Sequence, residues 1–290
     1  MKNEVHHFRV GAFRCIAISD GTFTYAPPLF PPPAATFFCN APAEHLKQAL
    51  LHYNLQPELW TEHTSPYTCL LVNTGSHRVL VDTGADGLSP GTGRLLLNLK
   101  AEGITPESID TVILTHCHPD HIGGNTLDNG TPAFPNARYV VGKTEWDFWI
   151  SEKGKGKTAH HTSQVLLGIA RKKMLPVQDR IHLIEPEEEI LPGIRAIAAP
   201  GHTPGHMAIS LVSEGEQVLC IADTVLHPVH LEHPAWYGVV DYDPDQLVST
   251  RHRILSRAVA EKALVHAFHF PFPGLGYIGK KGDGWQWQPV

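Results

Sequence analysis

Short apolar stretches separated by polar, glycine-rich or proline-rich stretches recur along the chain, and this pattern predicts many short β-strands. The stretches at 111–114, 217–222 and 263–268 are of this kind, and each leads directly into polar residues. Further strands are predicted near 7–19, at 69–72, 78–81, 138–141, 181–184 and 194–198, and from 207 in a hairpin that ends at 221. The chain is therefore expected to be rich in β-sheet.

Apolar residues recur with helical spacing in several segments between these strands. Helices are predicted at 44–52, at 94–102 and from Lys143 onward. A last helix follows Asp243, which can cap it, and Pro244 suits its first position. Its apolar face is Leu247, Ile254, Leu255 and Ala258. Strands with helices between them predict an α/β (α+β) fold, in which two sheets pack face to face and helices cover both outer surfaces.

A single domain over residues 1–290 is the expected organisation. The 42% hydrophobic content is enough for a large core, and no flexible linker or repeat divides the chain. The proline-rich segment 26–43 cannot join a sheet interior, so it is either a wall of the substrate pocket or an arm of a homodimer. Segment 151–163 contains glycines and cationic side chains, which is typical of a lid-like surface loop.

The charge and composition limit the partners. A net charge of -6 and a pI near 6.4 give no electrostatic reason to expect nucleic acid as a partner, which leaves a small-molecule substrate. No apolar run is long enough to cross a membrane, and the N-terminus lacks the apolar stretch of a secretory signal, so a cytoplasmic location is predicted. The five cysteines are odd in number and are expected to be reduced.

The most informative segment is Thr-His-Cys-His-Pro-Asp-His at 115–121, directly after the apolar stretch 111–114. In an extended segment residues i and i+2 point the same way, so His116 and His118 can bind one ion together. If the chain turns helical after Pro119, Asp120 and His121 face another direction and can bind a second ion. Imidazole and carboxylate groups are ligands that zinc and similar ions accept. The segment therefore predicts a two-metal site.

Further candidate ligands follow at three later loops. The loop at 199–206, rich in glycine and proline, ends in His206. The apolar stretch 217–222 leads into Asp223, and an acidic residue after a buried strand needs a partner or a metal. The stretch 263–268 leads into His269.

These motifs, in this order, resemble the metallo-β-lactamase superfamily of metallohydrolases over nearly the whole chain. The resemblance implies an αβ/βα four-layer sandwich of two mixed sheets with outer helices and two metal ions at one edge. It also implies one set of ligands for each ion, with Asp223 shared. The implied ligands are His116, His118 and His206 for the first ion, Asp120, His121 and His269 for the second, and Asp223 for both.

Hydrolysis is the chemistry that such a pair of ions supports, because a bridging hydroxide can act as the nucleophile. Asp120 and Asp223 are accordingly expected to be catalytic as well as ligands. His202 is expected to support a ligand rather than to bind metal. Asp82 either orients a ligand histidine or satisfies the backbone amides of its turn. Zinc is the expected ion, with manganese, cobalt or iron as alternatives.

The substrate has to be inferred from the loops. Residues 269–277 resemble the branch that contains methyl parathion hydrolase and related lactone and aryl-ester hydrolases, which predicts a lactonase or esterase with promiscuous phosphotriesterase activity. Leu226 stands where acyl-homoserine lactonases usually have tyrosine, which argues against a signal lactone. A hydroxyacylglutathione-type thioesterase and a metal-containing ligand-sensing protein are the alternatives. The predicted pocket residues are Leu226, Trp146, Trp149, Phe270 and Phe272.

Overall fold

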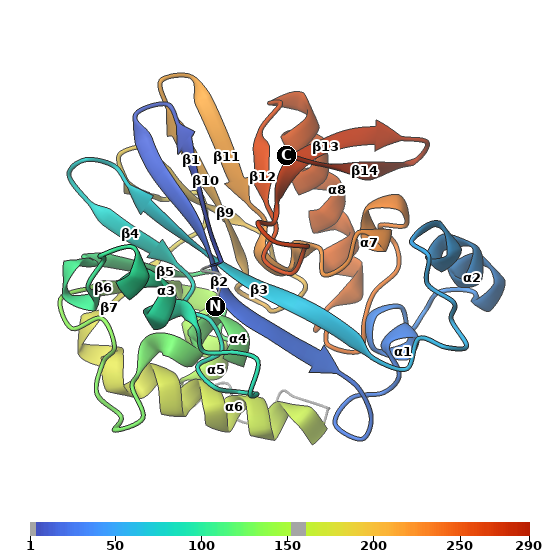
Figure 1. Cartoon of the computed structure of the whole chain (residues 1–290), viewed down its shortest axis with the longest axis horizontal. Helices are drawn as coiled ribbons and strands as arrows, with labels where there is room; N and C mark the ends of the chain where they lie inside the picture. Colours follow the sequence, from blue (N-terminus) through green and yellow to red (C-terminus); the bar gives the residue numbers. More distant parts are fainter. Residues whose placement is uncertain (1–3, 152–160) are drawn as a thin grey trace.

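Two mixed β-sheets of seven strands each pack face to face at the centre of the protein (Figure 1). The computed structural model describes residues 4–151 and 161–290. The first sheet holds β1 (Val5–Val10), β2 (Phe13–Tyr25), β3 (His63–Asn73), β4 (Arg78–Val81), β5 (Thr111–Leu114), β6 (Arg138–Gly142) and β7 (Ile181–Ile184), in that spatial order. The second holds β14 (Gly284–Pro289), β13 (Leu275–Lys281), β12 (Leu264–His266), β11 (Glu216–Cys220), β10 (Met207–Ser213), β9 (Ile194–Ala198) and β8 (Glu189–Leu191).

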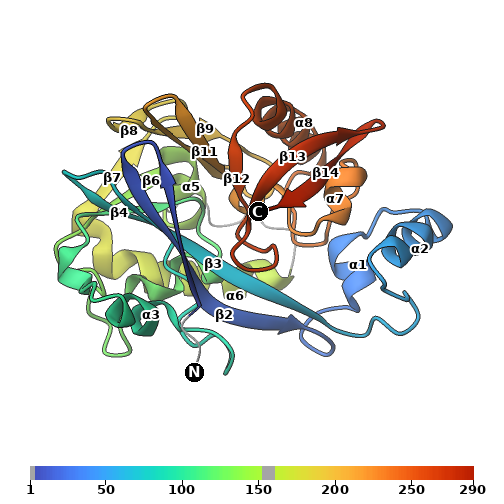
Figure 2. The same ribbon diagram turned by 45° about the horizontal axis from the view of Figure 1, so that its top comes forward.

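Helices cover the outer surface of each sheet, which gives the four layers that the sequence predicts (Figures 1 and 2). The first sheet is covered by α3 (Leu95–Ala101), α4 (Pro119–Ile122), α5 (Lys143–Trp149) and α6 (His161–Met174), and the second by α7 (Val229–Glu232) and α8 (Pro244–Ala260). At the far end of β2 and β3 lie α1 (Pro33–Phe37) and α2 (Ala43–His52). Short 3-10 turns are η1 (Pro106–Ser108), η2 (Gly123–Asn125), η4 (Leu175–Arg180) and η5 (Ala222–Thr224).

Alternation along the strands divides the core into layers. In β5, Ile113 packs between the two sheets with Ile209 of β10, whereas Val112 and Leu114 pack on the other face in the cluster that includes Leu99 of α3. All of these side chains are fully buried. Because successive strand residues point to opposite faces, a strand covered on both sides must be apolar at every position, as residues 112–114 are.

The parallel strand pairs place the predicted ligands at one edge. Strands β4, β5 and β6 are parallel neighbours, so Asp82 after β4 and residues 115–121 after β5 emerge on the same side. Strands β11 and β12 are also parallel, and they deliver Asp223 and His269 in the same way. Both sheets therefore direct their ligand-bearing loops to a common edge.

Most predicted elements are present. The helix after Asp243 begins with Pro244, and the Asp243 carboxylate accepts a hydrogen bond from the backbone of Gln246 at 3.0 Å. The hairpin of β13 and β14 and the extension of β2 as far as Tyr25 are elements that the sequence analysis did not predict. In the predicted lid-like loop 151–163, residues 152–160 lie outside the described part of the chain. All five cysteines are free, in agreement with the prediction. Within the described ranges, no helix has the length and apolar character needed to span a bilayer.

The layer between the sheets should dominate stability. Leu70 of β3 is fully buried there, so Leu70→Ala is expected to lower the free energy of unfolding by about 2–5 kcal/mol. Leu29, with 71% of its surface exposed, is the matched control, and Leu29→Ala should change that energy by less than about 0.5 kcal/mol. Urea unfolding at matched metal content measures both, and equal losses would contradict this layering.

Candidate metal centre

The segment after β5 changes from extended to helical at Pro119, as predicted. His118 has an extended backbone (φ -73°, ψ 153°) and precedes α4, whose first residue is Pro119. Cys117 is fully buried in the core behind the loop, so His116 and His118 turn to the opposite side. Asp120 and His121 lie within α4 and are both buried.

Two groups of buried ligand atoms result, and they share one carboxylate. Within each group all the ligand atoms lie within 4.8 Å of one another. The first group is His116, His118, His202 and Asp223, and the second is Asp120, His121, His269 and Asp223. Asp223 is therefore placed between the two groups, which is the position that a bridging ligand needs.

The Asp223 carboxylate is surrounded by imidazoles. Its Oδ1 lies 3.1 Å from Nε2 of His121, and its Oδ2 lies 3.2 Å from Nε2 of His269 and 3.1 Å from Nε2 of His202. Burial alone would raise the pKa of Asp223, but the neighbouring imidazoles, His269 foremost, hold that pKa well below its usual range. The carboxylate is thus charged and ready to bind a cation.

The residues fit divalent metal ions. Nε2 of His121 and Oδ1 of Asp223 are fully buried, and apart from their 3.1 Å contact with each other, which lacks hydrogen-bond geometry, neither has a partner among the described residues. Buried polar atoms without partners are rare in proteins, and a cation would satisfy both of these. Burial, followed by the charge of neighbouring imidazoles, lowers the pKa of His116 and of His118 well below the usual range. Both are therefore in the neutral form that metals require.

The structure places two histidines from the 199–206 loop at the first group. His202 belongs to it directly, because its Nε2 lies 2.9 Å from Nδ1 of His118. His206, the predicted ligand, lies beside it and accepts a hydrogen bond on Nε2 from the backbone N–H of Asp223 at 3.1 Å. The Nδ1 of His206 donates to the carbonyl oxygen of Ala199 at 2.9 Å, so Nε2 is the atom that could bind a metal if it gave up its hydrogen bond from Asp223. The metal role of His206 and the supporting role of His202 stay predictions.

Groups outside the two clusters orient the histidines, as metal-binding imidazoles usually require. The carboxylate of Asp82 lies 2.8 Å from Nδ1 of His121 and also accepts hydrogen bonds from Thr115. Both predicted roles of Asp82 are therefore present, because it orients a ligand and satisfies a backbone amide. Ser65 on β3, also in the first sheet, has its Oγ 3.0 Å from Nδ1 of His269, which follows β12 of the second sheet. Asp241 lies 2.7 Å from Nδ1 of His202.

Glu145 is a supporting residue that the sequence analysis missed. It is completely buried on α5, and its two carboxylate oxygens accept four hydrogen bonds. The donors are the backbone of Cys117 (2.9 Å), Trp149 Nε1 (2.6 Å), Thr203 Oγ1 (2.8 Å) and the backbone of Gly205 (2.9 Å). Glu145 therefore ties the loop of His116 and His118 to the loop of His202 and His206.

The predicted pocket residues divide into three groups. Trp149 is buried behind the metal ligands, with its ring centre 5.5 Å from that of His118, and Trp146 on the same helix is partly buried. Leu226 is buried in an apolar cluster, and Phe272 is partly buried. The prediction that Phe270 lines the substrate pocket is wrong. Phe270 is fully buried in the core beneath α8, where its ring packs against Trp287. The chain turns inward directly after His269 and carries Phe270 away from the metal groups.

Aromatic rings from other segments stand beside the second metal group instead, and we refer to them as the aromatic wall. Each ring of the wall packs against at least one other ring of the wall, with ring centres 5.1 to 6.3 Å apart. Burial, together with the nearby His269, lowers the pKa of His63 to about 4, so this imidazole is neutral and faces the metal groups. The aromatic wall consists of Tyr25, Phe37, Phe38, Trp60, His63 and His227.

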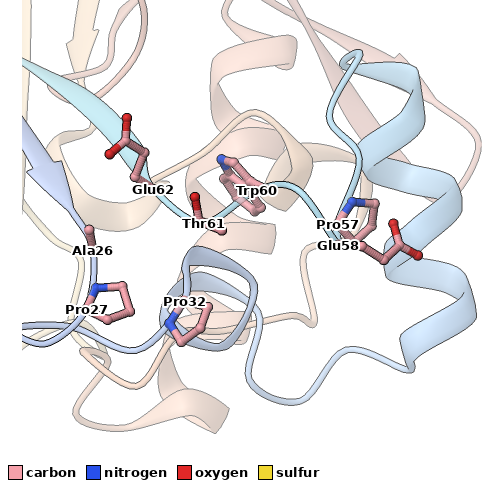
Figure 3. Close-up of a pocket in the computed structure, with 8 residues that line it drawn as sticks. All are labelled: Ala26, Pro27, Pro32, Pro57, Glu58, Trp60, Thr61 and Glu62. Atoms are coloured by element: carbon pink, nitrogen blue, oxygen red, sulfur yellow. The ribbon is translucent and has the colours of Figure 1, made fainter.

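A cavity of about 570 Å³ opens on the surface behind this wall. It lies between the proline-rich segment and the residues that precede β3, and Trp60 is among the residues that line it (Figure 3). The ring of Trp60 also contacts the rings of His63 and His227. None of the predicted pocket residues lines it. Its lining is Ala26, Pro27, Pro32, Pro57, Glu58, Trp60, Thr61 and Glu62. The proline-rich segment thus forms a wall of this cavity, and its role as a dimer arm stays a prediction.

The four hydrogen bonds to Glu145 should matter for metal binding. Glu145→Gln replaces one acceptor oxygen by a donor, so the bonds from Cys117 and Trp149 are lost in one amide orientation and the bond from Gly205 is lost in the other, where the Thr203 hydroxyl can turn to accept. Metal affinity, measured by competition with a chromophoric chelator, is expected to fall by about 10- to 100-fold. Asp147→Asn on the same helix breaks only an exposed pair with Lys143 and serves as the control. Equal affinity in both variants would exclude the supporting role.

The two histidines of the 199–206 loop can be separated by metal content. His206→Ala is expected to lower the bound metal from two ions per chain towards one, because it removes a direct ligand. His202→Ala should retain both ions but bind them with about 10- to 100-fold lower affinity, as loss of a supporting group does. Mass spectrometry of the purified variants measures the stoichiometry. The reverse pattern would assign the metal to His202, which the geometry of the first group also permits.

Solved structures with the same architecture support this interpretation of the site. One is AidC, a dizinc quorum-quenching lactonase in complex with a product, which is 25% identical, with a TM-score of 0.88 over 99% of this chain and 98% of that chain. Another is the hydrolase AbOPH of the β-lactamase superfamily, which is 30% identical, with a TM-score of 0.88 over 100% of this chain and 98% of that chain.

Curated relatives agree with the structural ones. N-acyl homoserine lactonases of Bacillus sp and Bacillus thuringiensis are 27% and 26% identical over 225 residues, which is 70% of this chain and 81% of each relative. With the two His/Asp groups, these relatives support a metal-dependent hydrolase. Residues 64–269 match the family model of the metallo-beta-lactamase superfamily, and this range contains all seven predicted metal ligands. The chain belongs to the metallo-β-lactamase superfamily.

Proposed function

We propose that this protein is a dinuclear hydrolase that opens lactone rings and cleaves aryl and alkyl esters, with phosphotriesters as promiscuous substrates. The observation that carries the proposal is the shared carboxylate of Asp223, which belongs to both buried ligand groups. Two divalent ions bound there, zinc foremost, would supply an activated water as nucleophile and positive charge beside the leaving oxygen. Asp120 completes the second group and is the other predicted catalytic carboxylate.

The protein's own residues prepare the site for this chemistry. Asp82 holds Nδ1 of His121, so that Nε2 of the same ring points at Asp223. His269 is fixed from the other sheet by Ser65. The rings of Phe268 and Tyr67 pack against these ligands and exclude water from their outer side. Electrostatic interactions with a substrate are stronger in such a dry site than in water.

The surroundings favour an uncharged substrate with an apolar substituent. The aromatic wall offers ring faces and neutral imidazoles, and its Tyr25 is hydrogen-bonded to Tyr67, whose ring packs against His269. A glutathione thioester carries carboxylates of its own, for which these rings and neutral imidazoles provide no positive partner, so the arrangement favours a lactone or ester over that alternative. The lactonase names of AidC and of the Bacillus relatives support the same substrate class.

The proposal is tested by metal loading and a substrate panel. The protein is reconstituted with zinc, manganese or cobalt, its metal content is measured, and turnover is followed on N-hexanoyl-homoserine lactone, dihydrocoumarin, p-nitrophenyl acetate, paraoxon and S-lactoylglutathione. We expect two ions per chain, with turnover of the lactones and the aryl ester and slower turnover of paraoxon. Two bound ions with turnover of the thioester alone would favour a thioesterase, and two bound ions with no turnover would favour a sensing protein.

Removal of the shared carboxylate should disable the site. Asp223→Ala is expected to lose at least one ion per chain and to lower kcat/KM by more than the about 10- to 100-fold typical of a supporting residue. Asp283→Ala changes an exposed carboxylate in the turn between β13 and β14 and is the control. Full metal content and unchanged turnover in Asp223→Ala would refute the proposal.

A further inference from the structure

Two phenol groups meet beside the metal ligands on the face of the first sheet that carries Ser65. Strands β2 and β3 are antiparallel, and Tyr25 is paired with His63, Phe23 with Ser65 and Gly21 with Tyr67. Residues directly opposite each other in such a pair point to the same face. This face therefore presents Tyr25 and Tyr67 on the same side as Ser65, whose hydroxyl contacts His269.

The two hydroxyl oxygens lie 3.0 Å apart, at hydrogen-bond distance. The ring of Tyr67 packs edge-on against the ligand His269, with ring centres 5.3 Å apart. The ring of Tyr25 contacts Phe37 of the aromatic wall at 5.2 Å. Tyr25 thus lies where the aromatic wall meets the metal groups.

Both phenols also lie within the electrostatic field of the metal-binding carboxylates. Burial, followed by the negative charge of Asp120, raises the pKa of Tyr25 well above its usual range. A phenol has an ordinary pKa of about 10, so both hydroxyl groups can serve as hydrogen-bond donors at neutral pH.

Burial decides which hydroxyl has a free proton. Tyr67 is 1% exposed, and the partner of its hydroxyl in the described part of the chain is Tyr25. If Tyr25 donated to Tyr67, the proton of Tyr67 would be buried without an acceptor, which costs about 1–3 kcal/mol. The 3.0 Å contact permits either direction, and donation from Tyr67 to Tyr25 avoids this cost, because Tyr25 is the more exposed of the two. The O–H of Tyr25 is then free to donate to another molecule.

Hydrolysis of a lactone or ester creates such an acceptor. When water adds to the carbonyl carbon, negative charge develops on the carbonyl oxygen, and a donor in a dry site stabilises it. We propose that Tyr25 is a catalytic residue that donates a hydrogen bond to the substrate's carbonyl oxygen, and that Tyr67 is a positioning residue that orients the Tyr25 hydroxyl. This inference rests on the proposed function.

Tyr25 keeps its proton throughout the reaction. A C–O bond forms between the carbonyl carbon and the attacking water, and the C–O bond to the ring or alcohol oxygen breaks. One proton of the water ends on the leaving oxygen, and the other passes to solvent when the product ionises to a carboxylate. The role of Tyr25 is therefore electrostatic, and its conservative replacement should leave metal binding intact.

The test removes one oxygen atom at a time. Tyr25→Phe should retain two ions per chain and lower kcat for lactone hydrolysis by about 10²-fold, as loss of a single donor to a developing oxyanion does. Tyr53→Phe is the matched control, because its hydroxyl donates to Glu232 at 2.8 Å, outside the metal groups. It should keep the kcat of the native protein.

A sulfur substrate shows whether the lost bond is to the carbonyl oxygen. Sulfur is a weak hydrogen-bond acceptor, so Tyr25→Phe should slow γ-butyrolactone much more than its thiono analogue, in which sulfur replaces the carbonyl oxygen. Tyr67→Phe should lower this oxygen-over-sulfur preference in the same direction, which a purely structural loss would not do. Because Tyr67 acts through Tyr25, the double variant should be no slower than Tyr25→Phe.

Binding of the ring-opened product provides a readout independent of turnover. N-hexanoyl-L-homoserine should bind the metal-loaded native protein more tightly than Tyr25→Phe by about 10-fold in calorimetry, because its carboxylate accepts the same hydrogen bond. If the native protein opens lactones and Tyr25→Phe matches it in kcat, in oxygen-over-sulfur preference and in product affinity, this inference is overturned. The proposed function would stand in that case. A native protein that neither opens lactones nor binds the product would overturn the proposed function and this inference with it.

Discussion

The concentration of imidazoles around one buried carboxylate is the constraint on which this site depends. Asp223 is almost fully buried, and its oxygens lie 3.1 to 3.2 Å from three histidine nitrogens. A charged carboxylate in such a place is stable only because positive charge surrounds it, whether from protonated histidines or from metal ions. The same carboxylate belongs to both ligand groups, so the spacing between the two groups is set by its size.

The two sheets can supply this carboxylate and its partners only because their parallel strands end at one edge. The first sheet contributes His116, His118 and His121, and the second contributes Asp223 and His269. Loops alone would hold such a cluster loosely. Buried carboxylates behind the ligands supply the rigidity, because Asp82 fixes one ring and Glu145 joins two loops through four hydrogen bonds.

One side of the site is apolar and neutral. The aromatic wall contributes ring faces and two uncharged histidines, and it reaches the candidate ligand His269 through Tyr25 and its hydrogen-bond partner Tyr67. Within this wall Tyr25 is exceptional, because it combines an aromatic face with a hydroxyl that its neighbour Tyr67 already orients. An apolar substituent and a polar reacting group can therefore be accommodated side by side, which is the division that an acylated lactone or an aryl ester requires.

The sequence by itself predicted a two-metal site and the layered fold, because the opening motif and the strand pattern depend on local spacing. Residues 115–121 contain the extended-to-helical change within themselves, and strand alternation sends Ile113 to one face of the sheet and Val112 and Leu114 to the other. Only the tertiary structure decided the substrate side and the supporting contacts. Glu145 is 28 residues from Cys117 and 60 from Gly205, and Tyr25 is 42 from Tyr67, so no local pattern marks these pairs.

Phe270 shows that neighbours in sequence can also be separated by the fold. Its proximity to His269 suggested a wall of the pocket, whereas the turn after the strand buries Phe270 in another part of the core. Ligand identity follows from neighbours along the chain, but pocket shape follows from which distant strands pack together.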